Sequence, residues 1–179
     1  MKITSCLIAI ISLTVGAFAA DKKSSVPDAK LSDYKLGTLI TGPAVDLANT
    51  GGKGVVIEQW GIHCPPCLAS LPHMEQLAKA KKAHVLFIGA HSQSTTDDQV
   101  KEVVKKNRLS YSIVNGASGP GGTGTIPHVF VFDATGKLIF NGTPFDREFD
   151  SAVQKAGRPA PGAAPAPSTP SAFTTTPKN

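Results

Sequence analysis

The stretch WGIHCPPC, residues 60 to 67, holds two of the three cysteines of the chain. Before it, the run GVVIEQW at 54–60 is apolar and largely continuous, which predicts a strand buried on both faces. After it, residues 64–82 carry apolar side chains at spacings of three and four, which predicts a helix. Pro72 lies inside that helix and removes one backbone hydrogen bond, so we expect a kink there. The cysteine pair is therefore expected where a buried strand passes into a helix.

The remaining chain alternates strand and helix patterns, and 41% of its 179 residues are hydrophobic, which suits one globular domain. We expect a second buried strand at 84–90, a helix within 94–109, a short strand at 111–114, a loop at 115–124, a hairpin of strands at 128–133 and 137–142, and a closing helix within 145–157. This order predicts an α/β fold with a central mixed β-sheet flanked by helices, spanning residues 34–157.

Residues 1–19 are predicted to be a secretory signal peptide. Lys2 precedes an apolar run at 7–15, and Ala17 and Ala19 form the A-x-A arrangement of a cleavage site. A membrane-spanning anchor is the alternative, but such a helix needs about 20 apolar residues and this stretch is shorter. Cleavage predicts an exported protein, periplasmic or extracellular, with no stable membrane insertion.

The two ends of the remaining chain differ in composition from its middle. Residues 20–33 are polar and charged and are predicted to form a flexible lead-in. Residues 158–179 are rich in Pro, Ala, Ser and Thr without an apolar period, which predicts a disordered tail. The formal net charge is +5, but the basic residues are scattered or form short runs at helix ends, such as KAKK at 79–82. No nucleic-acid partner is therefore predicted.

Signal cleavage would leave Cys64 and Cys67 as the only cysteines of an exported chain, where a disulfide is chemically allowed. A bridge between them closes a very short loop, whereas the entropic model of disulfide stabilisation rewards long loops. A purely structural role for such a disulfide is thus poorly motivated, and the sequence favours a chemical role for the pair. At the first turn of a helix, the free amides and the dipole favour a thiolate at Cys64. Pro65 and Pro66 fit that position, because the first turn has no internal partner for its amide hydrogens.

The pattern W-x-x-x-C-P-P-C after a buried strand, a proline five residues beyond the second cysteine, and I-P before a hairpin together resemble the thioredoxin superfamily. The CPPC form in an exported chain is similar to the TlpA and ResA type of bacterial thiol-disulfide oxidoreductase. The resemblance covers about residues 38–156 and implies a thioredoxin-like fold.

The resemblance implies roles for five residues. Cys64 would attack, Cys67 would resolve, and the two would form the Cys64–Cys67 disulfide. Pro127 would be the cis-proline that faces them, and Ile126 would offer its backbone to an extended substrate segment. Gly142 matches a family glycine near bound substrate. An ordinary trans-proline leading into an edge strand and a plain turn glycine are the alternatives.

Glu58 interrupts a strand that is expected to be covered on both sides, where an ionised carboxylate is costly unless it is paired. Burial would raise its pKa and let it accept a proton from Cys67. The matching position in thioredoxin is also acidic. A surface glutamate on a less buried strand is the alternative.

Three further residues flank the expected site. His63 stands where this family usually has tryptophan; protonated, it would favour the Cys64 thiolate, and neutral, it would do little. Trp60 either forms a wall beside the motif that contacts substrate or serves the core. His128, commonly threonine in relatives, either lines the substrate groove or starts a strand.

The sequence thus predicts a thiol-disulfide oxidoreductase that exchanges its dithiol with the thiols and disulfides of exported proteins, without a cofactor. By analogy with relatives it would act as a reductant, supplied by an upstream thiol-disulfide electron donor that the sequence does not identify. One alternative is a copper or zinc module that uses Cys64 and Cys67 with His63 or His128, although a closed zinc site needs four ligands and no second CxxC exists. Another is a scaffold that binds partners without redox turnover.

Overall fold

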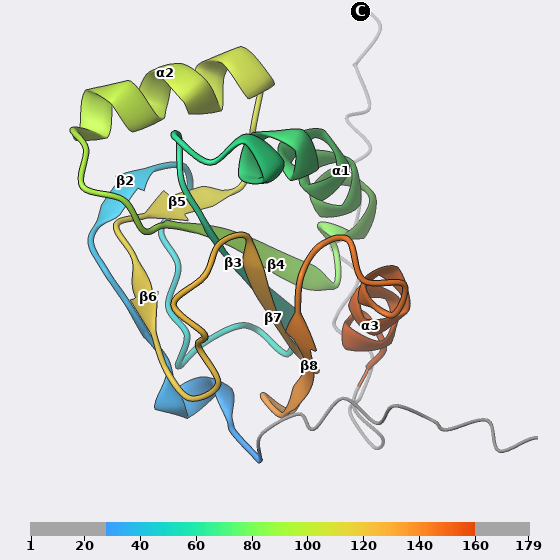
Figure 1. Ribbon diagram of the computed structural model, residues 1–179. Helices are drawn as coiled ribbons and strands as arrows, with labels where there is room; N and C mark the ends of the chain where they lie inside the picture. The colour runs from blue at the N-terminus through green and yellow to red at the C-terminus, as the bar shows by residue number, and fades with distance from the viewer. Residues whose placement is uncertain (1–27, 160–179) are drawn as a thin grey trace, which may run out of the picture.

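The computed structural model describes residues 28–159, and six of its strands form a central sheet in the order β2-β5-β4-β3-β7-β8 (Figure 1). The sheet strands are β2 (Leu39–Thr41), β3 (Gly54–Trp60), β4 (Val85–His91), β5 (Ser112–Val114), β7 (His128–Phe132) and β8 (Leu138–Gly142). β3, β4 and β5 run parallel, whereas β2, β7 and β8 join antiparallel to their neighbours. The expected α/β fold with a mixed sheet is confirmed.

The helices are α1 (Pro65–Lys81), α2 (Asp97–Asn107) and α3 (Phe149–Ala156). Buried residues of all three belong to one core cluster on one face of the sheet. α1 continues through Pro72, and α2 starts at a Thr96 cap whose hydroxyl accepts the Gln99 N–H. None of the helices in the described part of the chain is long and apolar enough to cross a membrane.

β3 lies between β4 and β7 and supplies both cores of the domain. Successive side chains of a strand point to opposite faces. Val56 and Trp60 accordingly pack in the helix-covered core, while Val55 and Ile57 pack in a second cluster on the other face. This double coverage explains why the sequence of β3 is a nearly continuous apolar run.

The second core is closed by a segment that the sequence analysis assigned to the flexible lead-in. Residues 28–33 include the 3-10 turn η1 (Leu31–Asp33), and Ala29 and Leu31 are buried. The Leu31 N–H donates to the Gly136 carbonyl at 2.7 Å, and the Leu138 N–H donates to Ala29 at 3.0 Å. The folded domain therefore begins earlier than residue 34, because two apolar side chains in a polar segment were too weak a pattern to predict it. The expected signal peptide, residues 20–27 and nearly all of the expected tail lie outside the described residues.

Three short strands were not predicted from the sequence. β1 (Lys35–Leu36) pairs antiparallel with β6 (Ala117–Ser118), which lies in the segment expected to be entirely loop. β2 pairs with β5 at the sheet edge. Strands of two or three residues have no periodicity of their own, because only the partner strand stabilises them.

Candidate active site

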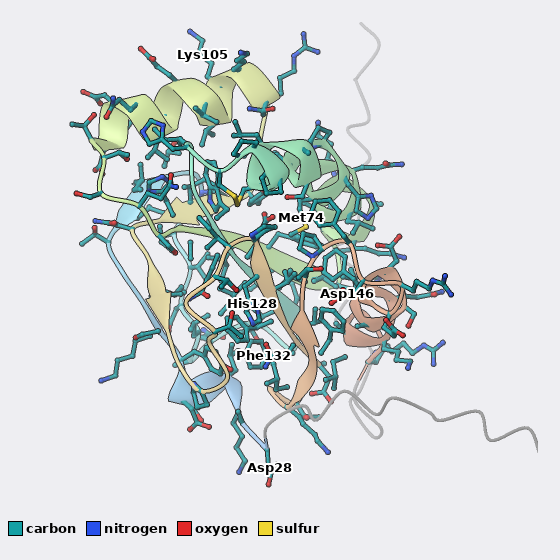
Figure 2. All side chains as sticks on the ribbon, in the orientation of Figure 1. Asp28, Met74, Lys105, His128, Phe132 and Asp146 are labelled. Carbon is teal, nitrogen blue, oxygen red and sulfur yellow. A yellow bond between two sulfur atoms is a disulfide. The ribbon has the colours of Figure 1, made fainter. Side chains whose placement is uncertain are left out.

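The two cysteines lie at the start of α1 and form a disulfide, visible as a yellow bond in Figure 2. Cys64 is the N-cap residue with extended backbone angles, and its Sγ accepts the N–H of Cys67 at 3.2 Å. Pro65 and Pro66 occupy the first helical positions, where no internal amide bond is lost. In the reduced state, the same N–H and the helix terminus favour a thiolate at Cys64.

The two sulfurs differ in access. Cys64 is 7% exposed, whereas Cys67 is fully buried. Cys64 Sγ also lies 3.8 Å from the carbonyl oxygen of Ile126, and the Ile126–Pro127 peptide bond is cis. The segment before β7 thus faces Cys64.

Glu58 lies in β3 and is fully buried, so the alternative of a surface glutamate is wrong. Its Oε1 lies 2.9 Å from Ser70 Oγ, which donates to it, while Oε2 has no partner in the described part of the chain. Burial raises the pKa of Glu58 from 4.5 to about 7, although the Ser70 hydrogen bond lowers it. A carboxyl group with this pKa can exchange a proton near neutral pH.

Ser70 can serve both protonation states of this carboxyl group. Its Oγ is 2.9 Å from Glu58 Oε1 and 2.8 Å from the Cys67 carbonyl oxygen. A hydroxyl donates one proton, so Ser70 donates to the carboxylate when Glu58 is ionised. When Glu58 is protonated, its own O–H can donate to Ser70, which then donates to Cys67. The contact therefore persists while Glu58 titrates.

Trp60 is fully buried in the same cluster as the cysteines, so it cannot contact a partner in this oxidised form. Its ring packs edge-on against His91 with centroids 5.4 Å apart. The core alternative is thus correct for Trp60, and the expectation of a substrate contact is not met.

The two histidines considered as metal ligands, His63 and His128, differ in exposure and in hydrogen-bond partners. His63 is exposed, and its backbone N–H donates to Gln93 Oε1 at 2.8 Å. His128, labelled in Figure 2, is buried at the start of β7, and its Nε2 lies 2.5 Å from Asn141 Oδ1. Among residues 28–159, no group of three or more His, Cys, Asp or Glu side chains could hold a metal ion.

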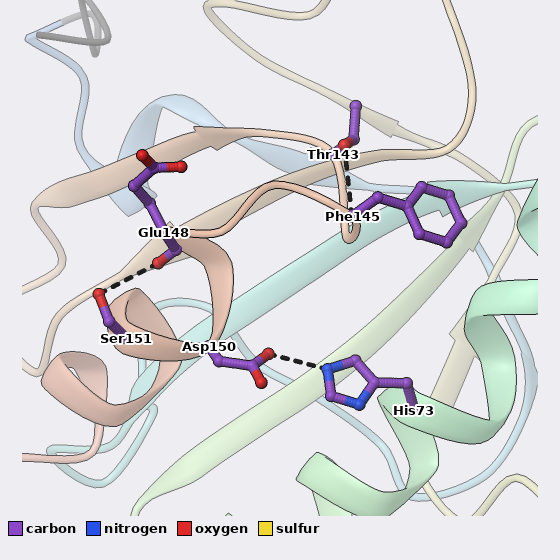
Figure 3. A network of polar contacts seen from close by, with 6 residues as sticks. All are labelled: His73, Thr143, Phe145, Glu148, Asp150 and Ser151. Carbon is purple, nitrogen blue, oxygen red and sulfur yellow. Dashed lines mark hydrogen bonds and ion pairs between the residues drawn. The ribbon is translucent and has the colours of Figure 1, made fainter. Parts of the chain in front are cut away.

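The turn after β8 presents an exposed aromatic side chain. Asp146 accepts the Thr143 N–H at 2.8 Å. Thr143 Oγ1 in turn accepts the Phe145 N–H at 3.3 Å, the contact drawn in Figure 3. A Cβ at Gly142 would meet the Asp146 carboxylate and the Phe140 ring, so these side chains would have to move to admit one. Phe145 is 58% exposed, and of the large hydrophobic residues described only Leu39 is also exposed.

A groove of about 440 Å³ runs beside the site. His91, Gln93, Asn115 and Ile126 are among the residues that line it. A larger cavity of about 710 Å³ lies at the other end of α1, where Ala78 and Lys82 line it, and it reaches neither cysteine. The lining of the smaller groove also contains neither cysteine, but it includes Ile126, whose carbonyl oxygen lies 3.8 Å from Cys64 Sγ.

Three residues of the site, Ser70, His91 and Gln93, were not predicted from the sequence. Ser70 was detectable as a polar residue one turn after Cys67, between apolar helix positions. His91 and Gln93 follow the apolar run of β4 and lie at the carboxyl end of the parallel strand next to β3. Side chains at the carboxyl ends of neighbouring parallel strands meet at one edge of the sheet, and that edge also carries the cysteines.

An accessible sulfur at a helix terminus, a buried partner sulfur and a facing cis-proline on this sheet define a thiol-disulfide oxidoreductase of the thioredoxin fold. A protein-family model described as Redoxin matches residues 21–156. The chain belongs to the Redoxin family.

Relatives of known activity agree with this class. The chain is 28% identical over 142 residues to the thiol-disulfide oxidoreductase ResA of Bacillus anthracis, covering 74% of this chain and 82% of that protein. It is 31% identical over 113 residues to ResA of Halalkalibacterium halodurans, covering 60% and 64%.

Solved structures show the same fold. A secreted disulfide oxidoreductase of Mycobacterium tuberculosis superposes with a TM-score of 0.54 at 25% identity, covering 67% of this chain and 94% of that chain. A DsbF homologue from Corynebacterium diphtheriae gives a TM-score of 0.60 at 17% identity, covering 68% and 83%.

Proposed function

We propose that the protein is exported, to the periplasm or the cell exterior, and reduces disulfides in protein partners there. The observation that carries the proposal is the difference in exposure between the two cysteines: Cys64 keeps 7% exposure beside Ile126, while Cys67 is fully buried. A partner disulfide can therefore reach only the first sulfur. The predicted signal peptide and the secreted relative from Mycobacterium tuberculosis support the exported setting.

The reaction proceeds by two exchanges from the dithiol form. The Cys64 thiolate attacks one sulfur of the partner disulfide, which forms a mixed disulfide and releases the other partner sulfur as a thiolate. Cys67 then attacks Cys64 Sγ, releases the partner's second thiolate and forms the Cys64–Cys67 disulfide. Two electrons pass to the partner, and an upstream protein dithiol must return two electrons to the enzyme.

Glu58 would act in the second exchange. Cys67 must lose a proton before it attacks, and its burial excludes bulk water as the direct acceptor. Glu58 is the buried carboxyl group connected through Ser70 to the Cys67 backbone. Its pKa of about 7 suits it to take that proton at neutral pH, directly or through a water molecule.

Ile126 would hold the partner. Its carbonyl oxygen lies beside Cys64 Sγ and can accept an N–H from an extended partner segment. Pro127 would present this carbonyl, and His63 and Gly142 would flank the approach of the partner.

Trapping with cysteine variants tests the proposal. Cys67→Ser should accumulate a mixed disulfide with a protein substrate, because no second sulfur resolves it, while Cys64→Ser, the matched control, should accumulate none. Equal trapping by both variants would refute the assigned roles. Titration against glutathione then gives the direction, since a reductant must have a potential below that of its partners.

A further inference from the structure

The end of β4 contacts the backbone of the turn that carries Cys64. Residues 61–63 connect β3 to α1, and the Cys64 N–H closes the turn on the Gly61 carbonyl at 3.3 Å. The Ile62 N–H donates to the His91 Nε2 at 3.3 Å. Gln93 accepts the next N–H of the turn, so two side chains from β4 and the segment after it bind consecutive backbone amides.

The His91 ring is fixed on several sides. His91 is only 2% exposed and pairs with Trp60 in the β3–β4 register. Its ring packs edge-on against Trp60, and the Ser92 N–H donates to the Trp60 carbonyl at 2.8 Å. The ring therefore cannot turn away from the Ile62 amide without disturbing the core beneath the cysteines.

The contact with Ile62 requires a neutral ring. An Nε2 that accepts a hydrogen bond carries no proton, so the proton of neutral His91 is on Nδ1. Burial lowers the pKa of His91 below 6.5, and His63 in the turn lowers it further, whereas Asp97 at the start of α2 raises it. At neutral pH the ring is therefore the acceptor that the geometry requires.

We propose that His91 is a positioning residue whose neutral ring, by accepting the Ile62 N–H, holds Cys64 at the helix terminus. The inference rests on the thiol-disulfide exchange proposed above. A loosened turn would let the Cys64 sulfur move away from the Cys67 N–H, which stabilises its thiolate. Protonation of His91 removes the acceptor, so acid conditions weaken this restraint in addition to protonating the cysteine.

Two substitutions at His91 separate the acceptor from the ring. His91→Gln keeps an acceptor near the Nε2 position and does not titrate, whereas His91→Leu removes the acceptor. His84→Leu, at the exposed residue just before β4, is the matched control. The measurement is the rate of Cys64 alkylation by iodoacetamide in the reduced full-length protein from pH 5 to 9, together with the urea midpoint of each variant.

The variants should differ in a defined way. Loss of one hydrogen bond predicts a fall of about fivefold in the alkylation rate at pH 7 for His91→Leu. His91→Gln should keep the wild-type rate at pH 7, and the ratio of its rate to the wild-type rate should rise as the pH falls, since only wild-type His91 can be protonated. The control should match the wild type throughout.

Several outcomes would overturn the inference. If Cys64 of His91→Leu is alkylated at the wild-type rate, His91 has no positioning role. If the alkylation rate falls equally in His91→Gln and His91→Leu, the effect comes from the packing of the ring and not from the hydrogen-bond acceptor. Should His91→Leu not fold, identical pH profiles for wild type and His91→Gln still refute the proposal. Failure of the wild type to exchange with glutathione would instead refute the proposed function, because alkylation does not depend on it.

Discussion

The substitution Glu58→Gln removes the buried titratable carboxyl group of the active site without changing the size of the side chain. The pKa of Glu58 rises from 4.5 to about 7 in the folded protein because the carboxyl group is buried. Each pKa unit corresponds to about 1.4 kcal/mol, so this rise amounts to about 3 kcal/mol of folding free energy.

The sign follows from proton binding. Below pH 4.5, Glu58 is protonated in both the folded and the unfolded chain, and its contribution to stability is fully present. Between pH 4.5 and about 7, the unfolded chain loses this proton while the folded chain keeps it, so the stability of the wild type falls as the pH rises. Glutamine has no such titration. The free energy of unfolding of Glu58→Gln minus that of the wild type should therefore increase by about 3 kcal/mol from pH 4 to pH 8.

Urea denaturation of the oxidised protein measures this difference. Trp60 is the only tryptophan of the chain and is fully buried, so its fluorescence reports unfolding. Glu102→Gln, on an exposed position of α2, makes the same chemical change outside the active site and is the matched control. A Glu58→Gln difference that is constant from pH 4 to pH 8 would contradict the raised pKa, and with it the proton acceptor for Cys67.

Three other outcomes are expected. Ser70→Ala removes the hydroxyl that donates to the buried β3 carboxylate, so the pKa of that carboxyl group should rise further and its infrared titration should shift to higher pH. Phe145→Ala should lower kcat/KM for reduction of a protein disulfide by about fivefold, because about 1 kcal/mol of contact with the partner is lost. Reduction of a small-molecule disulfide should not change. The control Leu39→Ala, at the opposite edge of the sheet, should leave both activities unchanged. A double-mutant cycle on the exposed His73–Asp150 pair, which joins α1 to α3 (Figure 3), should give a coupling below about 1 kcal/mol in urea unfolding.

Local patterns were sufficient for the parts of the fold that carry the motif. A continuous apolar run predicted β3 and β4 because both strands are covered on both faces. The spacing of apolar residues and the prolines after Cys64 predicted α1 and its start, since a helix terminus accepts proline without losing a bond. The short strands and the folded residues 28–33 escaped prediction because their stability comes from partners far along the chain.

The site itself divides in the same way. The sequence alone predicted the pair Cys64 and Cys67, because residues three positions apart at the start of a helix must lie close together. It also predicted the acidic residue in β3. Tertiary packing decided that Ile126, 62 residues from Cys64, faces the sulfur, that Ser70 contacts the buried carboxyl group, and that His91 binds the turn before the motif. Contacts between distant segments depend on how the sheet and helices pack, and no periodicity within either segment records them.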